Sequence, residues 1–360
     1  MIKHFIQNDK NSILDRSTFD QFQYGHSIVQ YNGQEINLKS FDIALLGWRN
    51  DQYSIIKQSL YALSSNFKDG KVIDLGIVKP DLVPLIELVD LLLKNKIFPI
   101  IITPKESAIE GQLKAYEQRY ELLNMAFINS TIPYSPNKGN ALINKILKYH
   151  PHLLMHLNCL GYQSYLTDKN TIDFLEDKYF DLHRLGLMQS RLEETEPILR
   201  DVNLAAFSIA SIRSSDAPAN IFRNPNGFLA AEACKIMRYL CMGDQLSSLC
   251  IHGFDLSIND MGQTSNMISQ LIWFAIEGFF SRTNEFPLQK KELKVFLVDN
   301  KAIGHSISFY KSSKSDRWWF EIPKALHPKR KLIACSYQDY QIACEGDLPD
   351  RLLNAINRLT

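Results

Sequence analysis

Polar side chains that could do chemistry follow several short apolar runs of this 360-residue sequence. The runs end in hydroxyl, amide, imidazole or thiol groups rather than in clusters of acids. The segments concerned are Thr103–Pro104–Lys105–Glu106, Asn129–Ser130–Thr131, Asn158–Cys159, Ser208–Ile209–Ala210 and His252–Gly253–Phe254–Asp255. Ligands of open parallel sheets bind beyond the carboxyl ends of the strands, so we expect the chemistry of the protein in these segments.

These segments are poor in the side chains that a pair of divalent metal ions requires. Two such ions close together need several carboxylates and imidazoles to offset their charge. Only Glu106, His252 and Asp255 are of these types, and Lys105 would repel a cation. The strand ends therefore predict a polar crevice without a two-metal centre.

The elements that must position these side chains alternate between strand and helix from about residue 41 to 285. Apolar runs of strand length occupy 42–48, 98–104, 122–129, 153–161, 203–212 and 246–254. Helical spacing occurs near 55–63, 80–96, 172–175, 193–201, 225–240 and 261–280. This alternation requires parallel strands with helices on both faces. We therefore predict an α/β fold with a sheet of six or more strands.

The end of the chain has a different character. Residues 307–312 and 317–323 alternate like a two-stranded antiparallel unit, and 348–359 has the spacing of a terminal helix. The sequence contains no internal repeat and no clear linker. We expect a single α/β domain over 41–360, preceded by an N-terminal extension over 1–40.

Composition restricts the classes of partner. Lys and Arg total 40 against 39 Asp and Glu, so no field of one sign is available to attract nucleic acid. The only dense basic run, Lys324–Lys331, is typical of a solvated turn. No apolar stretch approaches the roughly 20 residues of a membrane span, and the N-terminus lacks a signal peptide pattern. Six cysteines without a C-x-x-C pair favour reduced thiols in a cytoplasmic protein.

Several longer motifs carry a family resemblance that runs from about Asp42 to Arg351. The motifs are GYQSY (161–165), RLG (184–186), EP-x-x-R (196–200), RSSDAP (213–218), PNGF (225–228), EAC (232–234), RYL (238–240), QTSNMISQLIWFAIEGFF (263–280) and KSDRWW (314–319). Together they resemble a formiminoglutamase-like branch of the arginase superfamily. The resemblance implies a three-layer α/β/α sandwich around a mostly parallel sheet. Active members are manganese enzymes that hydrolyse guanidino or formimino C–N bonds.

The resemblance also says where the family's metal ligands would fall. Those ligands come from a Gly-Gly-x-His strand end, an Asp-Ala-His-x-Asp loop and an Asp-x-Asp strand end. The matching positions here are Glu106, Asn129, Thr131, Pro133, Ser208 and Ala210. Of these, only Glu106 could coordinate a metal tightly. A later Glu that contacts substrate in the family falls near Gly253, between His252 and Asp255.

The expectation is therefore a crevice that has lost its metal ions, with no metal, no cofactor and no catalytic residue. The chemistry needs a metal-bound hydroxide, because bulk water at neutral pH is too poor a nucleophile. We predict a pseudoenzyme that acts as a scaffold or binding protein. Its crevice would be occupied by a small molecule or by a protein partner. The chain could also form a homo-oligomer. One alternative is a divergent C–N hydrolase in which Glu106, His252 and Asp255 hold a single ion. Another is Cys159 as nucleophile, with His252 as its base.

Other polar pairs are interpreted as structural. Arg213 and Asp216 are expected to form a loop-fixing ion pair or a helix cap. Glu196 and Arg200 are spaced to pair on one helix.

Two further groups of residues can be interpreted either as structural or as functional. His150, His152 and His156 surround a Pro and enter a strand, so we expect them not to converge on a metal. Trp318 and Trp319 are adjacent in a predicted strand and should face opposite sides, one in the core and the other covering a partner surface.

Overall fold

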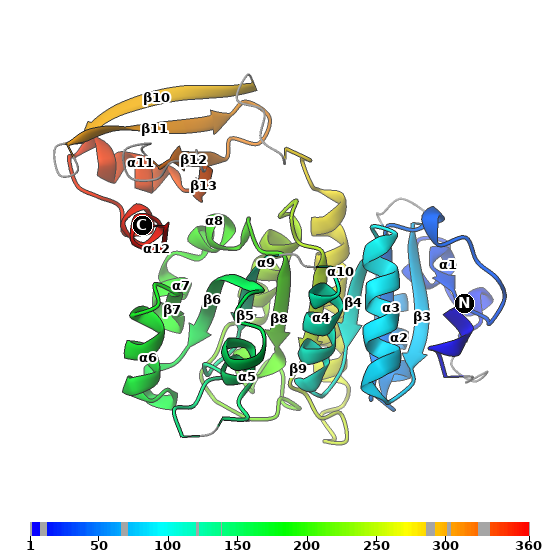
Figure 1. Ribbon diagram of the computed structural model, residues 1–360. Helices are drawn as coiled ribbons and strands as arrows, with labels where there is room; N and C mark the ends of the chain where they lie inside the picture. The colour runs from blue at the N-terminus through cyan, green and yellow to red at the C-terminus, as the bar shows by residue number, and fades with distance from the viewer. Residues whose placement is uncertain are drawn as a thin grey trace.

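The structure is a computed structural model that describes residues 2–7, 13–65, 71–119, 122–137, 139–285, 292–300, 304–322 and 332–359. The predicted basic turn Lys324–Lys331 lies outside these residues. Nine described strands form one central sheet, in which every neighbouring pair runs parallel (Figure 1). In spatial order they are β1 (Val29–Gln30), β3 (Val72–Val78), β2 (Ile43–Trp48), β4 (Phe98–Ile102), β9 (Ser248–His252), β8 (Leu204–Ser208), β5 (Leu123–Ile128), β6 (Leu154–Tyr162) and β7 (Asp181–Arg184).

The central strands are apolar runs because both faces of the sheet are covered. Every residue of β2, β4, β8 and β9 is buried. Successive side chains of a strand point to opposite faces. Ile43 and Leu45 accordingly join one core cluster, while Ala44 and Leu46 join the other. This is the pattern expected of a parallel sheet between two helical layers, and it confirms the predicted fold class.

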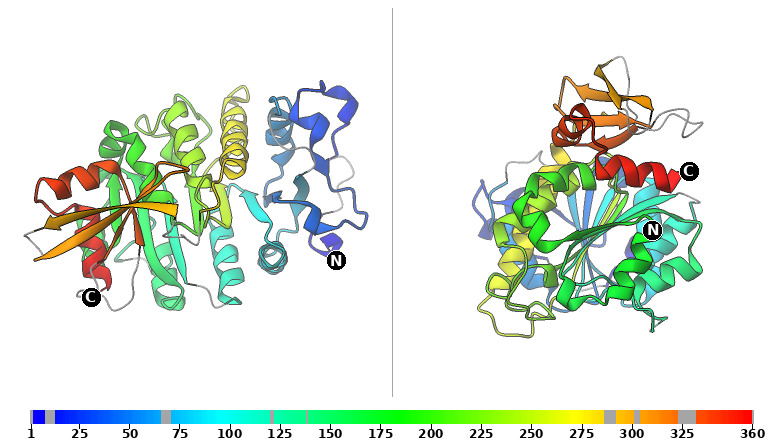
Figure 2. Two further views of the ribbon diagram at one scale, coloured as in Figure 1. Left: turned by 90° about the horizontal axis from the view of Figure 1, so that it is seen from above. Right: turned by 90° about the vertical axis from the view of Figure 1, so that its left-hand side faces the viewer.

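The two helical layers can be assigned from the core cluster that each helix joins (Figure 2). One layer contains α1 (Tyr24–Ser27), α2 (Tyr53–Tyr61), α7 (Leu185–Ser190), α8 (Thr195–Leu199), α9 (Ala230–Cys241) and α10 (Gln263–Phe280). The other contains α3 (Leu82–Lys94), α4 (Ser107–Glu117), α5 (Leu142–Tyr149) and α6 (Lys169–Glu176). The fold is therefore a three-layer α/β/α sandwich, as predicted.

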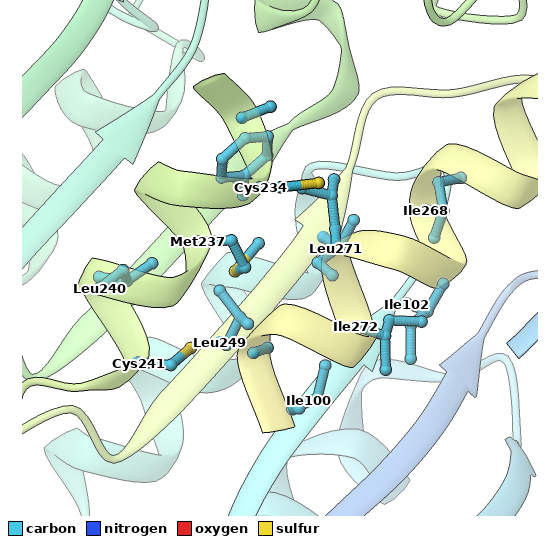
Figure 3. Packing of buried hydrophobic residues seen from close by; sticks show 14 of the residues in the cluster. Ile100, Ile102, Cys234, Met237, Leu240, Cys241, Leu249, Ile268, Leu271 and Ile272 are labelled. Atoms are coloured by element: carbon cyan, nitrogen blue, oxygen red, sulfur yellow. The ribbon is translucent and has the colours of Figure 1, made fainter. Parts of the chain in front are cut away.

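The interior of the first layer is built by α9 and α10 (Figure 3). Met237 of α9 and Leu271 and Ile272 of α10 pack over Ile102 and Leu249 of the sheet, and all five are buried. Full burial of a side chain of this size contributes about 1.5–3 kcal/mol. The predicted long helix near 261–280 is thus a core element of its own chain, packed against α9 and α2.

A second, four-stranded antiparallel sheet follows the sandwich. Its strands, in spatial order, are β10 (Leu293–Asn300), β11 (His305–Ser312), β12 (Trp318–Glu321) and β13 (Leu332–Cys335). With α11 (Tyr337–Cys344) and α12 (Asp350–Leu359) it forms what we call the C-terminal module. The sequence predicted only two of these strands. β13 has only four residues and is a strand because it pairs with β12. A local sequence pattern does not indicate such a pairing.

The C-terminal module lies at the amino ends of the central strands, opposite their carboxyl ends (Figure 1). Asn354 Nδ2 donates to Asp181 Oδ1 at the start of β7, at 3.2 Å. Arg200 Nη1, at the end of α8, donates to the carbonyl of Trp318 at 2.7 Å. The module is therefore joined to the sandwich by hydrogen bonds from both sides.

Trp318 and Trp319 face opposite sides of the second sheet, as predicted. Trp318 stacks on Tyr340 of α11, with ring centroids 4.9 Å apart. Trp319 lies under the guanidinium of Arg200, 4.8 Å from its ring centroid, and is only 3% exposed. The expectation that one tryptophan covers a partner surface is wrong, because Trp319 packs against the sandwich of its own chain.

The N-terminal segment contributes to the sandwich. Its strand β1 pairs in parallel with β3, and Ile6 forms a bridge to Val78 at the end of that strand. Tyr24 and Ile28 are buried in the core cluster that also holds α2. None of the helices within the described ranges is long and apolar enough to cross a membrane.

All six cysteines are free thiols, and only Cys344 is exposed. Burial raises the pKa of Cys234 and of Cys241 to about 12, which leaves negligible thiolate at neutral pH. We expect one thiol of the native protein to react quickly with Ellman's reagent and all six after denaturation. Cys344→Ser should remove the fast phase. Rapid reaction of further thiols in that variant would contradict this burial.

Candidate functional site

Four of the predicted strand-end side chains stand side by side on adjacent strands. Ser208 of β8 is paired in register with His252 of β9. Thr103 follows β4 and continues the pairing, its N–H donating to the carbonyl of Ile251 at 3.0 Å. Asn129 follows β5 at the level next to Ser208, because Ile128 pairs with Phe207. Thr103, His252, Ser208 and Asn129 thus form a row across the carboxyl edge, which we call the strand-end row.

The oxygens of the strand-end row are used to fix their own loops. Thr103 Oγ1 accepts from the N–H of Lys105 at 3.1 Å. Asn129 Oδ1 accepts from the N–H of Ser130 at 2.9 Å. Ser208 Oγ accepts from the N–H of Ala210 at 3.3 Å. Such local bonds from side chain to backbone stabilise turns, so these three side chains serve the path of the loops.

His252 is the one imidazole in the row, and it is held neutral. Burial lowers its pKa to about 4, so it carries no charge at neutral pH. The next residue, Gly253, has a φ of +82°, and an added Cβ there would lie 2.5 Å from Ser208 Oγ. The loop after β9 therefore passes close to the end of β8.

Asp255 and Glu106 lie at the rim of this edge rather than in the row. Asp255 is exposed, and its Oδ1 accepts from the N–H and hydroxyl of Ser257, which lowers the pKa of the carboxyl. Glu106 precedes α4. Much of it is exposed, although surrounding protein atoms desolvate its carboxyl and raise the pKa, while Lys145 opposes this.

The other predicted positions have backbone or core roles. Ala210 is fully buried in the turn after β8. The carbonyl of Pro133 accepts from the N–H of Ile143 at 2.9 Å and so ties this loop to α5. Thr131, in the same loop as Pro133, is half-buried. Within the part of the chain that the structure describes, no three His, Cys, Asp or Glu side chains are grouped to hold a metal ion, so Glu106, His252 and Asp255 do not form such a group.

The proposed pair of Cys159 and His252 is wrong. β6 continues to Tyr162, so Cys159 lies within the strand and not at its end. β5 and β8 stand between β6 and β9 in the sheet. Burial also raises the pKa of the Cys159 thiol far above its ordinary value, so it is not a nucleophile at neutral pH.

The three clustered histidines do not converge, as predicted. His150 Nδ1 and His152 Nε2 lie 3.3 and 3.9 Å from Glu117 Oε1. His156, inside β6, instead pairs with Asp181 Oδ2 at 2.9 Å.

A cavity of about 510 Å³ lies at the carboxyl ends of β6 and β7, beside the strand-end row. Four of the motifs that carry the family resemblance meet in it, and we call it the motif pocket. They are GYQSY (161–165), RLG (184–186), Arg213 of RSSDAP, and PNGF (225–228), of which Pro225 to Gly227 line the cavity. None of these residues was predicted as a site residue. The signal available was the presence of Arg184 and Arg213 in motifs that end strands.

The wall of the motif pocket is held by amide groups. Gln163 Nε2 donates to the carbonyl of Asn226 at 3.0 Å, and Asn224 Nδ2 donates to Gln163 Oε1 at 3.2 Å. Asn226 Nδ2 donates to the hydroxyl of Tyr165 at 3.0 Å. A Cβ on Gly227 would lie 2.4 Å from the backbone nitrogen of Arg213, so these segments can meet only with glycine there.

The motif pocket contains two guanidinium groups and no lining carboxylate. Arg184 Nε donates to the hydroxyl of Tyr162 at 3.1 Å, which raises the pKa of Arg184 further. Arg213 Nε donates to Asp216 Oδ1 at 2.9 Å, and Asp216 Oδ2 accepts from the N–H of Ala230 at the start of α9. The predicted ion pair and the predicted helix cap are therefore both present. Among the described residues, the Nη groups of both arginines make no hydrogen bond.

Comparison with solved structures places this architecture among known folds. A Trypanosoma cruzi formiminoglutamase with Mn²⁺ aligns over 69% of this chain and 96% of its own, at 14% identity and a TM-score of 0.62. The Bacillus subtilis formimidoylglutamase aligns over 77% and 95%, at 14% identity and a TM-score of 0.61. An agmatine ureohydrolase of Thermoplasma volcanium aligns over 75% and 98%, at 15% identity and a TM-score of 0.55.

Sequence comparison gives no match, neither to a protein-family model nor to a curated protein. At the identities found, the solved structures show the fold alone. The chain has the three-layer α/β/α fold of the formiminoglutamase and agmatine ureohydrolase structures, the arginase fold that the sequence motifs predicted.

Proposed function

We propose that the chain is a non-catalytic binding protein built on the arginase fold, and that it binds a small carboxylate-bearing molecule at the carboxyl edge of the sheet. The observation that supports the non-catalytic assignment is the composition of the strand-end row. Its four side chains are one neutral imidazole, two hydroxyls and an amide, and three of them already accept a backbone N–H.

The residues present do not fit a pair of manganese ions. Mn²⁺ prefers carboxylate and imidazole donors, and two such ions need several negative charges nearby. In the described structure the row supplies none, and the nearby carboxylates of Glu106 and Asp255 lie at the exposed rim. Without a metal to lower its pKa, water at this edge stays a poor nucleophile. We therefore assign no hydrolytic step to this chain.

The motif pocket supports the proposal that the chain binds a small carboxylate-bearing molecule. Arg184 and Arg213 both present free Nη groups, and a planar guanidinium can bind a carboxylate through two parallel hydrogen bonds. The amide network of Gln163, Asn224 and Asn226 holds the wall between them. A protein partner or a second copy of the chain is the other occupant we propose for this edge.

Metal content and turnover test the non-catalytic assignment. After incubation with Mn²⁺ and dialysis, we expect far less than one equivalent of manganese per chain by mass spectrometry. We also expect no release of urea or formamide from guanidino or formimino compounds. An active formiminoglutamase assayed in parallel supplies the positive control. Two equivalents of manganese together with turnover would overturn the assignment, and one equivalent with turnover would favour the single-ion hydrolase.

Charge removal tests the binding site. We expect Arg184→Gln and Arg213→Gln each to weaken glutarate binding by about tenfold or more in calorimetric titration, the loss of one charge-assisted contact. Arg223→Gln is the matched control, because Arg223 is exposed at the same edge but does not line the pocket. Equal affinity in all three variants, or no binding by the native chain, would contradict this site.

A further inference from the structure

The first strand of the C-terminal module, β10, is paired on one side only. It stands at the edge of the four-stranded sheet, and among the described residues no strand pairs with its outer side. Figure 1 shows it as the outermost strand of the module, farther from the sandwich than β11. Its pairing with β11 runs without a bulge over its whole length. Such a long, regular edge is a template for the addition of another strand.

The backbone groups at this edge can be identified from the hydrogen bonds of β11. The N–H of Ser312 donates to the carbonyl of Arg317, on the side of β12, at 2.9 Å. Successive residues of an antiparallel strand direct these groups to alternate sides, so the odd-numbered residues of β11 bond to β10. Their partners in β10 are the even-numbered residues. The backbone groups that point outward are therefore those of Leu293, Val295, Leu297 and Asp299.

The side chains at the centre of this edge are apolar and exposed. Val295 is 53% exposed and Leu297 is 72% exposed. Both lie on one face of the sheet, because alternate residues of a strand share a face. Phe296 and Val298 lie on the other face and pack in the core of the module. Edge strands are usually protected by charges, proline or bulges, and the segment 295–298 has none of these.

We propose that a second copy of the chain covers this edge, with β10 pairing antiparallel to β10 of the other copy. A two-fold axis perpendicular to the sheet passes beside Phe296. Val295 of each copy then lies opposite Leu297 of the other, so the same two exposed side chains cover each other. Each copy contributes its four strands to one continuous antiparallel sheet.

The register follows from the outward backbone groups. With the axis beside Phe296, Leu293 of each copy lies opposite Asp299 of the other, so each of the outward residues both donates and accepts a hydrogen bond. A shift by two residues leaves Leu293 or Asp299 of each copy without a partner in the opposite strand. No like charges face each other in this register, because Lys294 lies opposite Val298. The edge is thus complementary to itself, which favours a second copy over an unrelated strand.

The oligomeric state tests the proposal directly. In sedimentation velocity we expect a monomer–dimer equilibrium that shifts toward dimer as the protein concentration rises. Leu297→Glu and Val295→Lys should each weaken dimerisation about tenfold or more, because each removes both apolar cross-strand pairs. Val83→Lys is the matched control, since Val83 of α3 is 60% exposed and lies outside the module. All variants should keep the circular dichroism and the melting temperature of the native monomer.

A charge-pair variant tests the register. In Val295→Lys with Leu297→Glu, the introduced lysine of each copy lies opposite the introduced glutamate of the other. Opposite charges across a strand pair attract, so the double variant should dimerise more strongly than either single one. Its dimerisation should weaken as salt is added, unlike that of the native chain. In a register shifted by two residues, like charges would face each other instead.

Three results would overturn the proposal: a native chain that stays monomeric at millimolar concentration, equal dimerisation of Leu297→Glu and Val83→Lys, or a double variant weaker than both single ones. The β10 edge takes no part in the motif pocket, so this proposal does not rest on the function proposed above. Arg184→Gln with Arg213→Gln should dimerise as the native chain does, and Leu297→Glu should still bind glutarate. The failure of either proposal is therefore distinguishable from the failure of the other.

Discussion

Replacing Asp74 with alanine should destabilise the protein by about 3–5 kcal/mol, the usual loss when one member of a buried ion pair is removed. Asp74 lies on β3 and is 1% exposed. Its carboxylate pairs with Lys57 Nζ at 3.0 Å and accepts from the hydroxyl of Tyr61 at 2.7 Å. It also accepts from the hydroxyl of Tyr53 at 3.2 Å and from the N–H of Gly76 at 2.8 Å.

The large effect follows from what the carboxylate leaves behind. In Asp74→Ala, the buried ammonium of Lys57 and two buried phenol groups lose their shared acceptor. An unsatisfied buried donor costs about 1–3 kcal/mol, more when it is charged. Urea denaturation followed by tryptophan fluorescence measures the loss. Asp51→Ala, at an exposed position, should change the free energy of unfolding by less than about 0.5 kcal/mol.

A double variant separates burial of charge from loss of packing. Lys57→Met with Asp74→Leu removes both charges and keeps apolar volume, so it should recover part of the stability that Asp74→Ala loses. If Asp74→Ala were no less stable than Asp51→Ala, the buried cluster would not be the stabilising feature described here.

Replacing Glu196 with alanine should cost a similar amount, about 3–5 kcal/mol, and should loosen the C-terminal module. Glu196 of α8 accepts from Arg200 Nε at 3.0 Å and from Arg317 Nε of the module at 2.9 Å. Both guanidiniums are buried, with exposures of 5% and 8%. Hydrogen exchange should accelerate in α8 and β12 of the variant and stay slow in β2. Uniform acceleration would mean that the loss is global rather than at this junction.

The same carboxylate gives a pH dependence. Burial raises the pKa of Glu196, but Arg200 and Arg317 lower it by more, so the net shift is downward. A depressed folded-state pKa contributes stability that is present above the unfolded value, about 4.3, and is lost as pH falls through the folded value. Glu196→Gln should therefore show a smaller loss of stability on acidification than the native chain. Glu35→Gln, at an exposed position, should lose as much stability on acidification as the native chain does.

Much of the fold could be predicted because the relevant patterns are local. The continuous apolar runs that became β2, β4, β8 and β9 signal strands buried on both faces. Boundaries were less exact: the helix expected from residue 225 begins at Ala230, because Pro225–Gly227 belong to a loop that lines the motif pocket. The strands β10 and β13 depend on pairing within the module, which is not a local property.

The site was only half accessible to sequence reasoning. Sheet topology alone brings Thr103, Ser208, Asn129 and His252 to one edge. That the oxygens of three of them cap their own loops depends on the path of each loop, which no spacing encodes. The motif pocket was missed because Arg184 and Arg213 are 29 positions apart and meet only through the order of the strands.

The edge strand β1 has a consequence for how the chain is made. Synthesis proceeds from the N-terminus, and domains begin to fold as they emerge. Residues 29–30, which pair with Ile73 and Asp74 of β3, therefore leave the ribosome before this apolar strand does. An uncovered apolar strand edge is a template for pairing with other chains. We therefore expect the N-terminal segment to limit pairing of this part of β3 with other chains during synthesis.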